Sequence, residues 1–252
     1  MTDTEHRHSG TFARIETVGR ATMILGDCMD YMTGLEDKAF ELAIVDPPYG
    51  IGMDGQIGGN NCGTATKHEK KSWDTSIPEL KYWEELFRVS ENQVIWGGNY
   101  FTEFLPPRMG WIFWDKQSSG NFSDGELAWT SFNRALEKFT FSWMGMRQGN
   151  MKNKETRIHP TQKPVALYKW LLSRYAKPGD RILDTHGGSG SSVIACNDLG
   201  FDIVWIEKDE DYYNAAVERC RLAAAQGKLF DAPPAPKYSE PFLFTEDTKC
   251  KK

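Results

Sequence analysis

The sequence predicts an α/β fold with a mostly parallel, doubly wound sheet that also contains an antiparallel strand pair. Two observations carry this prediction: short apolar runs alternate with segments of helical spacing, and acidic residues repeatedly end the apolar runs. Strands that are joined through helices run parallel, and helices then cover both faces of the sheet. With 252 residues, the chain has the length of one large domain.

The first half of the chain supplies most of the strands. Four apolar runs predict buried strands, at residues 21–27 (ATMILGD), 40–46 (FELAIVD), 92–98 (NQVIWGG) and 110–116 (GWIFWDK). Residues 78–89 (PELKYWEELFRV) have helical spacing, and Ser76 precedes them as a candidate cap. Residues 126–132 and 136–143 alternate enough to predict the antiparallel pair.

The second half alternates strand and helix more regularly. The sequence predicts helices at 163–177, 191–200 and 210–226, strands at 180–184 and 201–209, and a glycine-rich turn at 185–192. The polar and basic stretch 144–158 lacks periodicity and is predicted to be a loop. We therefore expect an N-terminal extension (1–20), one domain (21–226) with that loop inside it, and a proline-rich flexible tail (227–252).

Composition narrows the class of protein. The five cysteines form no C-x-x-C pair, which predicts free thiols in a reducing, cytoplasmic environment and no structural zinc or other metal site. No apolar run is long enough to predict a membrane span. The first ten residues lack the layout of a signal peptide.

Four acids fall at or just beyond the ends of predicted strands, and three of them are Asp27, Asp46 and Asp184. The fourth, Glu207, closes the strand after the glycine-rich turn. Ligands of parallel sheets bind beyond the carboxyl ends of the strands, so these acids mark the expected site.

The glycine-rich turn predicts a nucleoside ligand, although such a turn is also typical of a tight strand-to-helix bend. Gly187, Gly188 and Gly190 let a ligand approach the backbone, with Ser189 between them. The third glycine of the dinucleotide fingerprint is absent, which disfavours a nicotinamide dehydrogenase, and so is the G-K-[ST] ending of a phosphate loop.

Two acids refine this ligand. Asp184, directly before the turn, repels phosphates and favours a cationic amine, and Glu207 is spaced to bond both hydroxyls of a ribose. A nucleoside with an ammonium group and no phosphate fits S-adenosylmethionine.

The segment DPPYG, residues 46–50, predicts a site for an amino group, although it also suits a rigid turn. Pro47 and Pro48 lack N–H donors and leave carbonyls free to accept hydrogen bonds. The carboxylate of Asp46 beside a free carbonyl matches an –NH2 group, which has two hydrogens to donate. Tyr49 offers a flat face on which a base stacks.

Together, DPPYG, ILDTHGGSG and HPTQKP (159–164) resemble the amino-methyltransferases of DNA, which use S-adenosylmethionine. The order of these motifs is that of the β group of the family, and the resemblance covers about residues 21–221. The resemblance implies a Rossmann-like methyltransferase fold and an enzyme that methylates double-stranded DNA. It also implies adenine N6 as the methylated position, because an acid opens the DPPY motif. The departure from the family is the turn itself, where Thr185 and His186 replace proline and phenylalanine.

The resemblance also implies a role for each motif position. Asp46, Pro47, Pro48 and Tyr49 are expected to be catalytic, holding the amine of a base flipped out of the duplex. Asp27 is expected to bond the cofactor's adenine, and Lys163 to be the counter-charge of its carboxylate. The full expected cofactor set is Asp27, Cys28, Thr161, Gln162, Lys163, Asp184, Gly187, Gly188, Ser189, Gly190 and Glu207.

Two basic stretches are candidates for DNA contact, although solvated loops have the same composition. The residues concerned are Lys67, Lys70, Lys71, Arg147, Lys152, Lys154 and Arg157, and the loop 144–158 is the expected target-recognition region. Gln226, Leu229 and Phe230 match the loose pattern by which bacterial replication proteins dock on the sliding clamp, a pattern that also arises by chance. Three alternatives stay open from the sequence: an RNA adenine-N6 methyltransferase, a DNA cytosine-N4 methyltransferase, and a non-catalytic module that binds cofactor or nucleic acid.

Overall fold

The computed structural model describes residues 12–53, 71, 73–118, 123–144 and 147–226. Its main element is a nine-stranded sheet in the order β1-β2-β11-β10-β3-β4-β6-β5-β7. The strands are β1 (Arg14–Val18), β2 (Ala21–Leu25), β3 (Phe40–Val45), β4 (Ser90–Trp96), β5 (Trp111–Asp115), β6 (Gly125–Thr130), β7 (Glu137–Thr140), β10 (Arg181–Asp184) and β11 (Asp202–Glu207).

The centre of this sheet is parallel and its margins are mixed. β2, β11, β10, β3 and β4 pair in parallel, whereas β1 is antiparallel to β2 and β6 is antiparallel to both β4 and β5. The predicted fold class is therefore confirmed.

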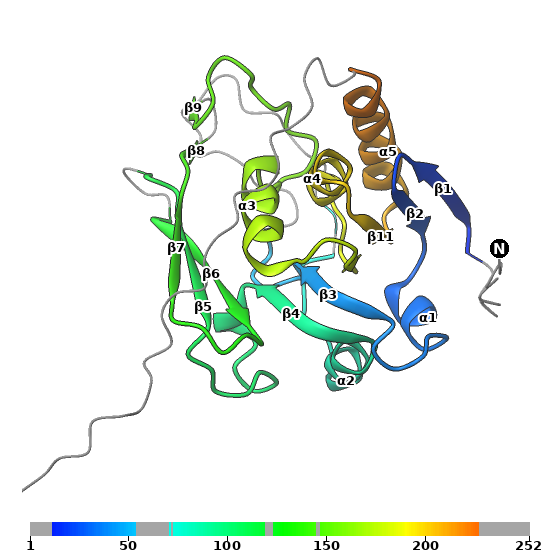
Figure 1. Ribbon diagram of the computed structural model, residues 1–252, viewed down its shortest axis with the longest axis vertical. Coiled ribbons are helices and arrows are strands. Elements are labelled where there is room, and N and C mark those ends of the chain that lie inside the picture. The colour runs from blue at the N-terminus through cyan, green and yellow to red at the C-terminus, as the bar shows by residue number, and fades with distance from the viewer. Residues whose placement is uncertain (1–11, 54–70, 72, 119–122, 145–146, 227–252) are drawn as a thin grey trace, which may run out of the picture.

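Helices cover both faces of the sheet (Figure 1). On one face lie α3 (Val165–Tyr175), α4 (Ser191–Leu199) and α5 (Glu210–Ala225), whose buried residues form one core. On the other lie α1 (Cys28–Met32) and α2 (Leu80–Val89), with a second core. Because side chains alternate along a strand, Leu42 and Ile44 of β3 enter the first core, and Ala43 and Val45 the second.

The chain reverses its winding direction between β10 and β3. After β10 it crosses through α4 to β11, and after β3 it crosses through α2 to β4, on the opposite face. Such a switch point leaves an opening beyond the carboxyl ends of the two strands. The DPPYG segment and the glycine-rich turn both follow strands at this point.

Three local predictions were wrong. The two strands predicted as an antiparallel pair, β6 and β7, do not pair with each other; both flank β5, and β7 runs parallel to it. Residues 14–18, expected in an extension, form β1 and complete the edge of the sheet. Ser76 does not cap α2, which begins at Leu80 after Glu79, with no capping side chain.

The stretch 144–158 is not wholly irregular. β8 (Trp143–Met144) pairs antiparallel with β9 (Arg147–Gln148), and the side chain of Gln148 bonds the backbone of Glu155 in both directions. The predicted tail and the Leu229 and Phe230 pair lie outside the described residues; Gln226 ends α5.

Candidate active site

A single cavity of about 1260 Å³ lies at the switch point and joins the two motifs. Its lining includes Asp46 and Pro48 from the DPPYG segment, Gly187 and Gly188 from the glycine-rich turn, and Glu207 from the end of β11. Expected cofactor residues Asp27, Cys28, Thr161, Gln162, Lys163 and Ser189 also line it. The structure thus brings together residues that are up to 180 positions apart (Asp27 to Glu207, 207 − 27).

The glycines of the turn are required by packing as well as by conformation. A Cβ atom on Gly187 would lie 1.9 Å from the Trp205 ring, and one on Gly190 would lie 2.7 Å from Cys220 Sγ. Gly188 and Gly190 have positive φ values of 52° and 72°, which disfavour other residues. The backbone N–H of Gly187 donates to Ile206 O at 2.9 Å, which ties the turn to β11.

Asp184 lies behind this turn and is not one of the described residues that line the cavity. It is 1% exposed, its Oδ2 accepts from the Ser192 hydroxyl at 2.6 Å, and its Oδ1 accepts from His186 N at 3.2 Å. Burial raises the pKa of Asp184 to about 7. The expectation that it faces a ligand amine is revised: Asp184 holds the turn in shape.

Glu207 and Asp27 do reach the cavity. Glu207 Oε2 accepts from Gly188 N at 2.8 Å, and its Oε1 accepts from Asp209 N at 2.8 Å, so the carboxylate is fixed beside the turn. Asp27 caps α1 through Met29 N at 2.9 Å and pairs with Lys208 at 2.8 Å. Both acids keep further lone pairs for a polar ligand.

The residues that replace the family's proline and phenylalanine form their own small network. The hydroxyls of Thr185 and Tyr82 lie 2.8 Å apart, and the ring of His186 packs edge-on against Tyr82 at 5.3 Å. Burial lowers the pKa of His186 to about 4, so its ring is neutral at pH 7. His186 therefore presents a flat, uncharged ring to the cavity.

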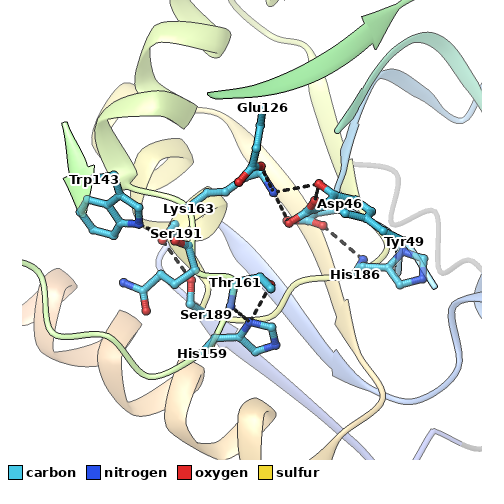
Figure 2. A network of polar contacts seen from close by, with 12 residues as sticks. Asp46, Tyr49, Glu126, Trp143, His159, Thr161, Lys163, His186, Ser189 and Ser191 are labelled. Atoms are coloured by element: carbon cyan, nitrogen blue, oxygen red, sulfur yellow. Dashed lines mark hydrogen bonds and ion pairs between the residues drawn. The ribbon is translucent and has the colours of Figure 1, made fainter. Parts of the chain in front are cut away.

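Asp46 is held by two partners at the end of β3. Its Oδ1 accepts from the Tyr49 hydroxyl at 2.6 Å, and its Oδ2 accepts from Lys163 Nζ at 2.5 Å (Figure 2). Burial raises the pKa of Asp46, and Lys163 opposes that shift. Lys163 was expected to face the cofactor's carboxylate, and the structure pairs its ammonium with Asp46 and also with Glu126 at 3.2 Å.

Tyr49 is already stacked. Its ring lies 4.9 Å from that of Tyr100, at an angle of 15°, and a Cβ on Gly97 would lie 2.2 Å from it. Tyr100, which is 42% exposed, was not singled out from the sequence. One face of the expected stacking platform is thus covered by a partly exposed tyrosine.

The HPTQKP segment forms the wall between the cavity and the loop 144–158. Gln162 accepts from Ile158 N at 2.9 Å through its side chain and from Trp143 Nε1 at 2.7 Å through its carbonyl. His159 packs between the rings of Trp73 and Tyr212, at 5.3 and 4.3 Å. The segment is therefore built into the fold rather than free to move as a surface loop.

The expected nucleic-acid residues divide into three groups. Lys67 and Lys70 lie outside the described residues. Arg147, Lys152 and Lys154 are exposed, as expected of DNA contacts. Lys71 and Arg157 are engaged within the protein: Lys71 pairs with Asp209 and Asp211 at 2.6 and 2.7 Å, and Arg157 lies over the Trp143 ring at 4.7 Å.

Sequence reasoning also missed Glu126 and Arg219. Arg219 of α5 donates to Ser189 O at 2.7 Å and pairs with Glu155 at 2.7 Å, which links the glycine-rich turn to the stretch 144–158. Glu126 stands in a predicted core strand, and its only signal was an acid in an apolar run. Among the described residues, no cluster of metal-ligating side chains and no helix able to span a membrane is present.

Comparisons with known proteins agree with this geometry. A model of the DNA methylase family of N6 and N4 methyltransferases matches residues 95–218. Type II methyltransferase M.HpaI of Haemophilus parainfluenzae is 26% identical over 238 residues, covering 78% of this chain and 73% of the relative. Type II methyltransferase M.HinfI of Haemophilus influenzae is 25% identical over 249 residues, covering 79% and 68%.

Solved structures show the same fold. The cytosine-N4-specific PvuII DNA methyltransferase superposes with a TM-score of 0.56 at 11% identity, covering 86% of this chain and 96% of that one. The M1.HpyAVI–SAM complex has a TM-score of 0.50 at 20% identity, covering 79% and 99%.

Proposed function

We propose that this chain, a member of the DNA methyltransferases, transfers a methyl group from S-adenosylmethionine to N6 of adenine in double-stranded DNA. The observation that carries the proposal is the shared cavity: Asp46, at the end of β3, opens onto the same space as the glycine turn after β10. An amine held at Asp46 and a cofactor held at the turn would therefore meet.

The residues around the cavity fit the cofactor. The Glu207 carboxylate would accept hydrogen bonds from the ribose hydroxyls, and Asp27 would bond the cofactor's adenine. The neutral ring of His186 offers a surface on which that adenine would pack. The related M1.HpyAVI structure was solved as a complex with this cofactor. Bound S-adenosylmethionine would supply the methyl group, which is attached to its positively charged sulfur. As the amine nitrogen bonds the methyl group, the bond from sulfur to methyl would break and leave a neutral thioether.

Asp46 and the carbonyl of Pro47 would each accept one hydrogen of the amine and so orient its lone pair towards the methyl group. Hydrogen bonds that favour a tetrahedral nitrogen draw the lone pair out of the ring and raise its reactivity. After transfer the nitrogen carries a surplus proton, which leaves through Asp46 or water. No further general base is required, and neither histidine of the site is assigned that role.

Adenine is preferred to cytosine because an acid opens the DPPY motif, and cytosine-N4 enzymes more often carry serine there. The PvuII enzyme, which has the same fold, keeps cytosine N4 as the second candidate. RNA adenine is the third, since the motif occurs in enzymes for both nucleic acids.

The test is methyl transfer from labelled cofactor to duplex DNA, single-stranded DNA and RNA, followed by digestion to nucleosides. We expect the label in N6-methyladenine from duplex DNA. Label in N4-methylcytosine, or on RNA alone, would overturn the choice of base or of nucleic acid.

The exposed Arg147, Lys152 and Lys154 would contact the phosphates, with sequence preference set by the loop 144–158. Contact of Gln226, Leu229 and Phe230 with a sliding clamp stays a proposal, and an unchanged pull-down after Leu229→Ala and Phe230→Ala would remove it.

A further inference from the structure

Four charged side chains of alternating sign lead away from the active site, and Figure 2 shows three of them, Asp46, Lys163 and Glu126. Asp46 pairs with Lys163 at 2.5 Å, Lys163 pairs with Glu126 at 3.2 Å, and Glu126 pairs closely with Lys116. The four come from the end of β3, the HPTQKP segment, β6 and the residue after β5. We call this set the charge chain.

The charge chain has a buried lysine at its centre and three partly buried partners, so it is not a surface ion pair. The side chain of Lys163 is 3% exposed, that of Asp46 16%, and those of Lys116 and Glu126 19% and 25%. Burying a charge is costly unless an opposite charge compensates for it. With two acids and two lysines the chain is neutral, so Lys163 is compensated without any ligand.

Groups from several elements face Lys163 and Asp46. The Tyr49 hydroxyl lies 3.3 Å from Lys163 Nζ, and the Trp96 ring of β4 lies 5.4 Å from it. Asp184 of β10, Tyr168 of α3 and Tyr82 of α2 are further titratable groups that interact with Asp46. Glu126 thus shares one cation, Lys163, with Asp46.

The two acids respond differently to this sharing. Burial acts to raise the pKa of Glu126, but Lys163 and Lys116 together lower it to about 2, so Glu126 stays ionised. Burial raises the pKa of Asp46, which has Lys163 as its cation and Glu126 as a repelling charge. Burial acts to lower the pKa of Lys163, but its two acids raise it, so Lys163 stays protonated.

We propose that Lys163, anchored by Glu126, is a positioning residue that keeps Asp46 ionised and aimed at the substrate amine, and is not the counter-charge of the cofactor. Glu126 draws part of the ammonium's interaction away from Asp46, which leaves carboxylate lone pairs for the amine. This inference rests on the proposed function in one respect: Asp46 is the group that receives the amine.

The proposal predicts opposite effects from two neutral substitutions. Lys163→Gln removes the cation beside Asp46, so the acid limb of the pH profile of kcat/KM for DNA should move to higher pH, by about 1 or more. Glu126→Gln removes a repelling anion, so the same limb should move to lower pH. The double variant Glu126→Gln with Lys163→Gln should return the limb towards that of the unsubstituted protein. Lys163→Arg keeps the positive charge, so its acid limb should stay closer to that of the unsubstituted protein than the acid limb of Lys163→Gln does.

A structural disturbance would not produce opposite displacements, and Lys138→Gln provides the matched control. Lys138 pairs with Asp115 at 3.4 Å beside β5 but is 58% exposed, so its loss should leave the limb in place. Equilibrium binding of S-adenosylmethionine should change less than about 3-fold in Lys163→Gln. Binding weakened 10-fold or more with an unmoved acid limb would overturn the proposal and return Lys163 to the cofactor's carboxylate.

A second readout does not depend on activity. In protein labelled with ¹³C at aspartate carboxyl groups, Asp46→Asn identifies the Asp46 resonance, and its titration is followed in each variant. The resonance should titrate at higher pH in Lys163→Gln and at lower pH in Glu126→Gln. Movement in the same direction, or none, contradicts the proposal even if methyl transfer falls on another base. If Lys163→Gln does not fold, Glu126→Gln and the neutral double variant decide the question.

Discussion

At the scale of single residues, the site depends on which side chains are charged and which are kept neutral. Asp46 meets its cation inside the protein, whereas His186 is kept uncharged on the wall of the cavity. The ordinary pKa of a histidine is near 6.5, and in the folded protein that of His186 is about 4. The unfolded chain therefore binds this proton more strongly than the folded one.

This difference predicts an acid-dependent loss of stability. The stabilising contribution is fully present above about pH 6.5 and is lost as the pH falls through about 4, with a size of about 3 kcal/mol. His186→Phe, which restores the ring usual in the family, should remove that part of the loss. Denaturant unfolding of both proteins at pH 7.5 and pH 4.5 checks this. Equal losses in the two proteins would contradict the assignment of a neutral imidazole in the folded protein.

The role of Lys163 could not be predicted from the sequence around it. The HPTQKP motif placed this lysine near the cofactor, but the motif says nothing of which side of the segment its ammonium points to. That direction is set by Glu126, which lies in a strand 37 positions earlier (163 − 126) and is adjacent only in the fold. A role that depends on a distant partner could not be predicted from either residue's neighbours in sequence.

At the scale of elements, the glycine-rich turn is shaped by the strand beside it. Gly187→Ala would place a Cβ 1.9 Å from the Trp205 ring of β11, so the turn or the ring must shift. We expect a loss of unfolding free energy of about 2 kcal/mol or more, together with weaker cofactor binding. Gly34→Ala is the matched control, because its Cβ would meet only ordinary contact at 3.7 Å. Chemical unfolding measures both, and equal effects would show that the packing against Trp205 is unimportant.

The contact of Lys71 with the start of α5 leads to a second prediction at this scale. Lys71 bonds Asp209 and Asp211 at the start of α5 and lies over the Tyr212 ring at 4.7 Å, beside the cavity. We therefore expect Lys71→Gln to weaken cofactor binding a few-fold and to leave the salt dependence of DNA binding unchanged. Lys152→Gln, on the exposed loop, should instead lower the salt slope by about 1 and spare the cofactor. The reverse pattern would make Lys71 a DNA contact after all.

Element pairing shows where prediction from the sequence ended. Strands such as β3 and β10 were recognisable because buried parallel strands are continuous apolar runs that end in an acid. The arrangement of β5, β6 and β7 was not, since alternation along 126–132 and 136–143 fits any half-buried strand and does not name a partner. The edge strand β1 was missed because only its pairing with β2 makes it a strand.

At the scale of the whole molecule, function depends on the sheet order. The DPPYG segment and the glycine turn are about 140 residues apart in the chain (187 − 46 = 141), and they meet because β3 and β10 are neighbours at the switch point. The motif residues and the fold class could be predicted, since each leaves a local pattern. The charge chain, the stack of Tyr100 on Tyr49 and the place of Asp184 behind the turn depend on contacts between elements, and no local pattern encodes them.

The most direct test of the central claim compares the unsubstituted protein with Asp46→Ala in two parallel assays, methyl transfer to duplex DNA and equilibrium binding of S-adenosylmethionine. If Asp46 holds the adenine amine beside a separately bound cofactor, the unsubstituted protein deposits label in N6-methyladenine. The variant should then lose transfer by about 10³-fold or more while its cofactor affinity changes little. Transfer that survives in Asp46→Ala, or cofactor binding that is lost with it, would contradict the account.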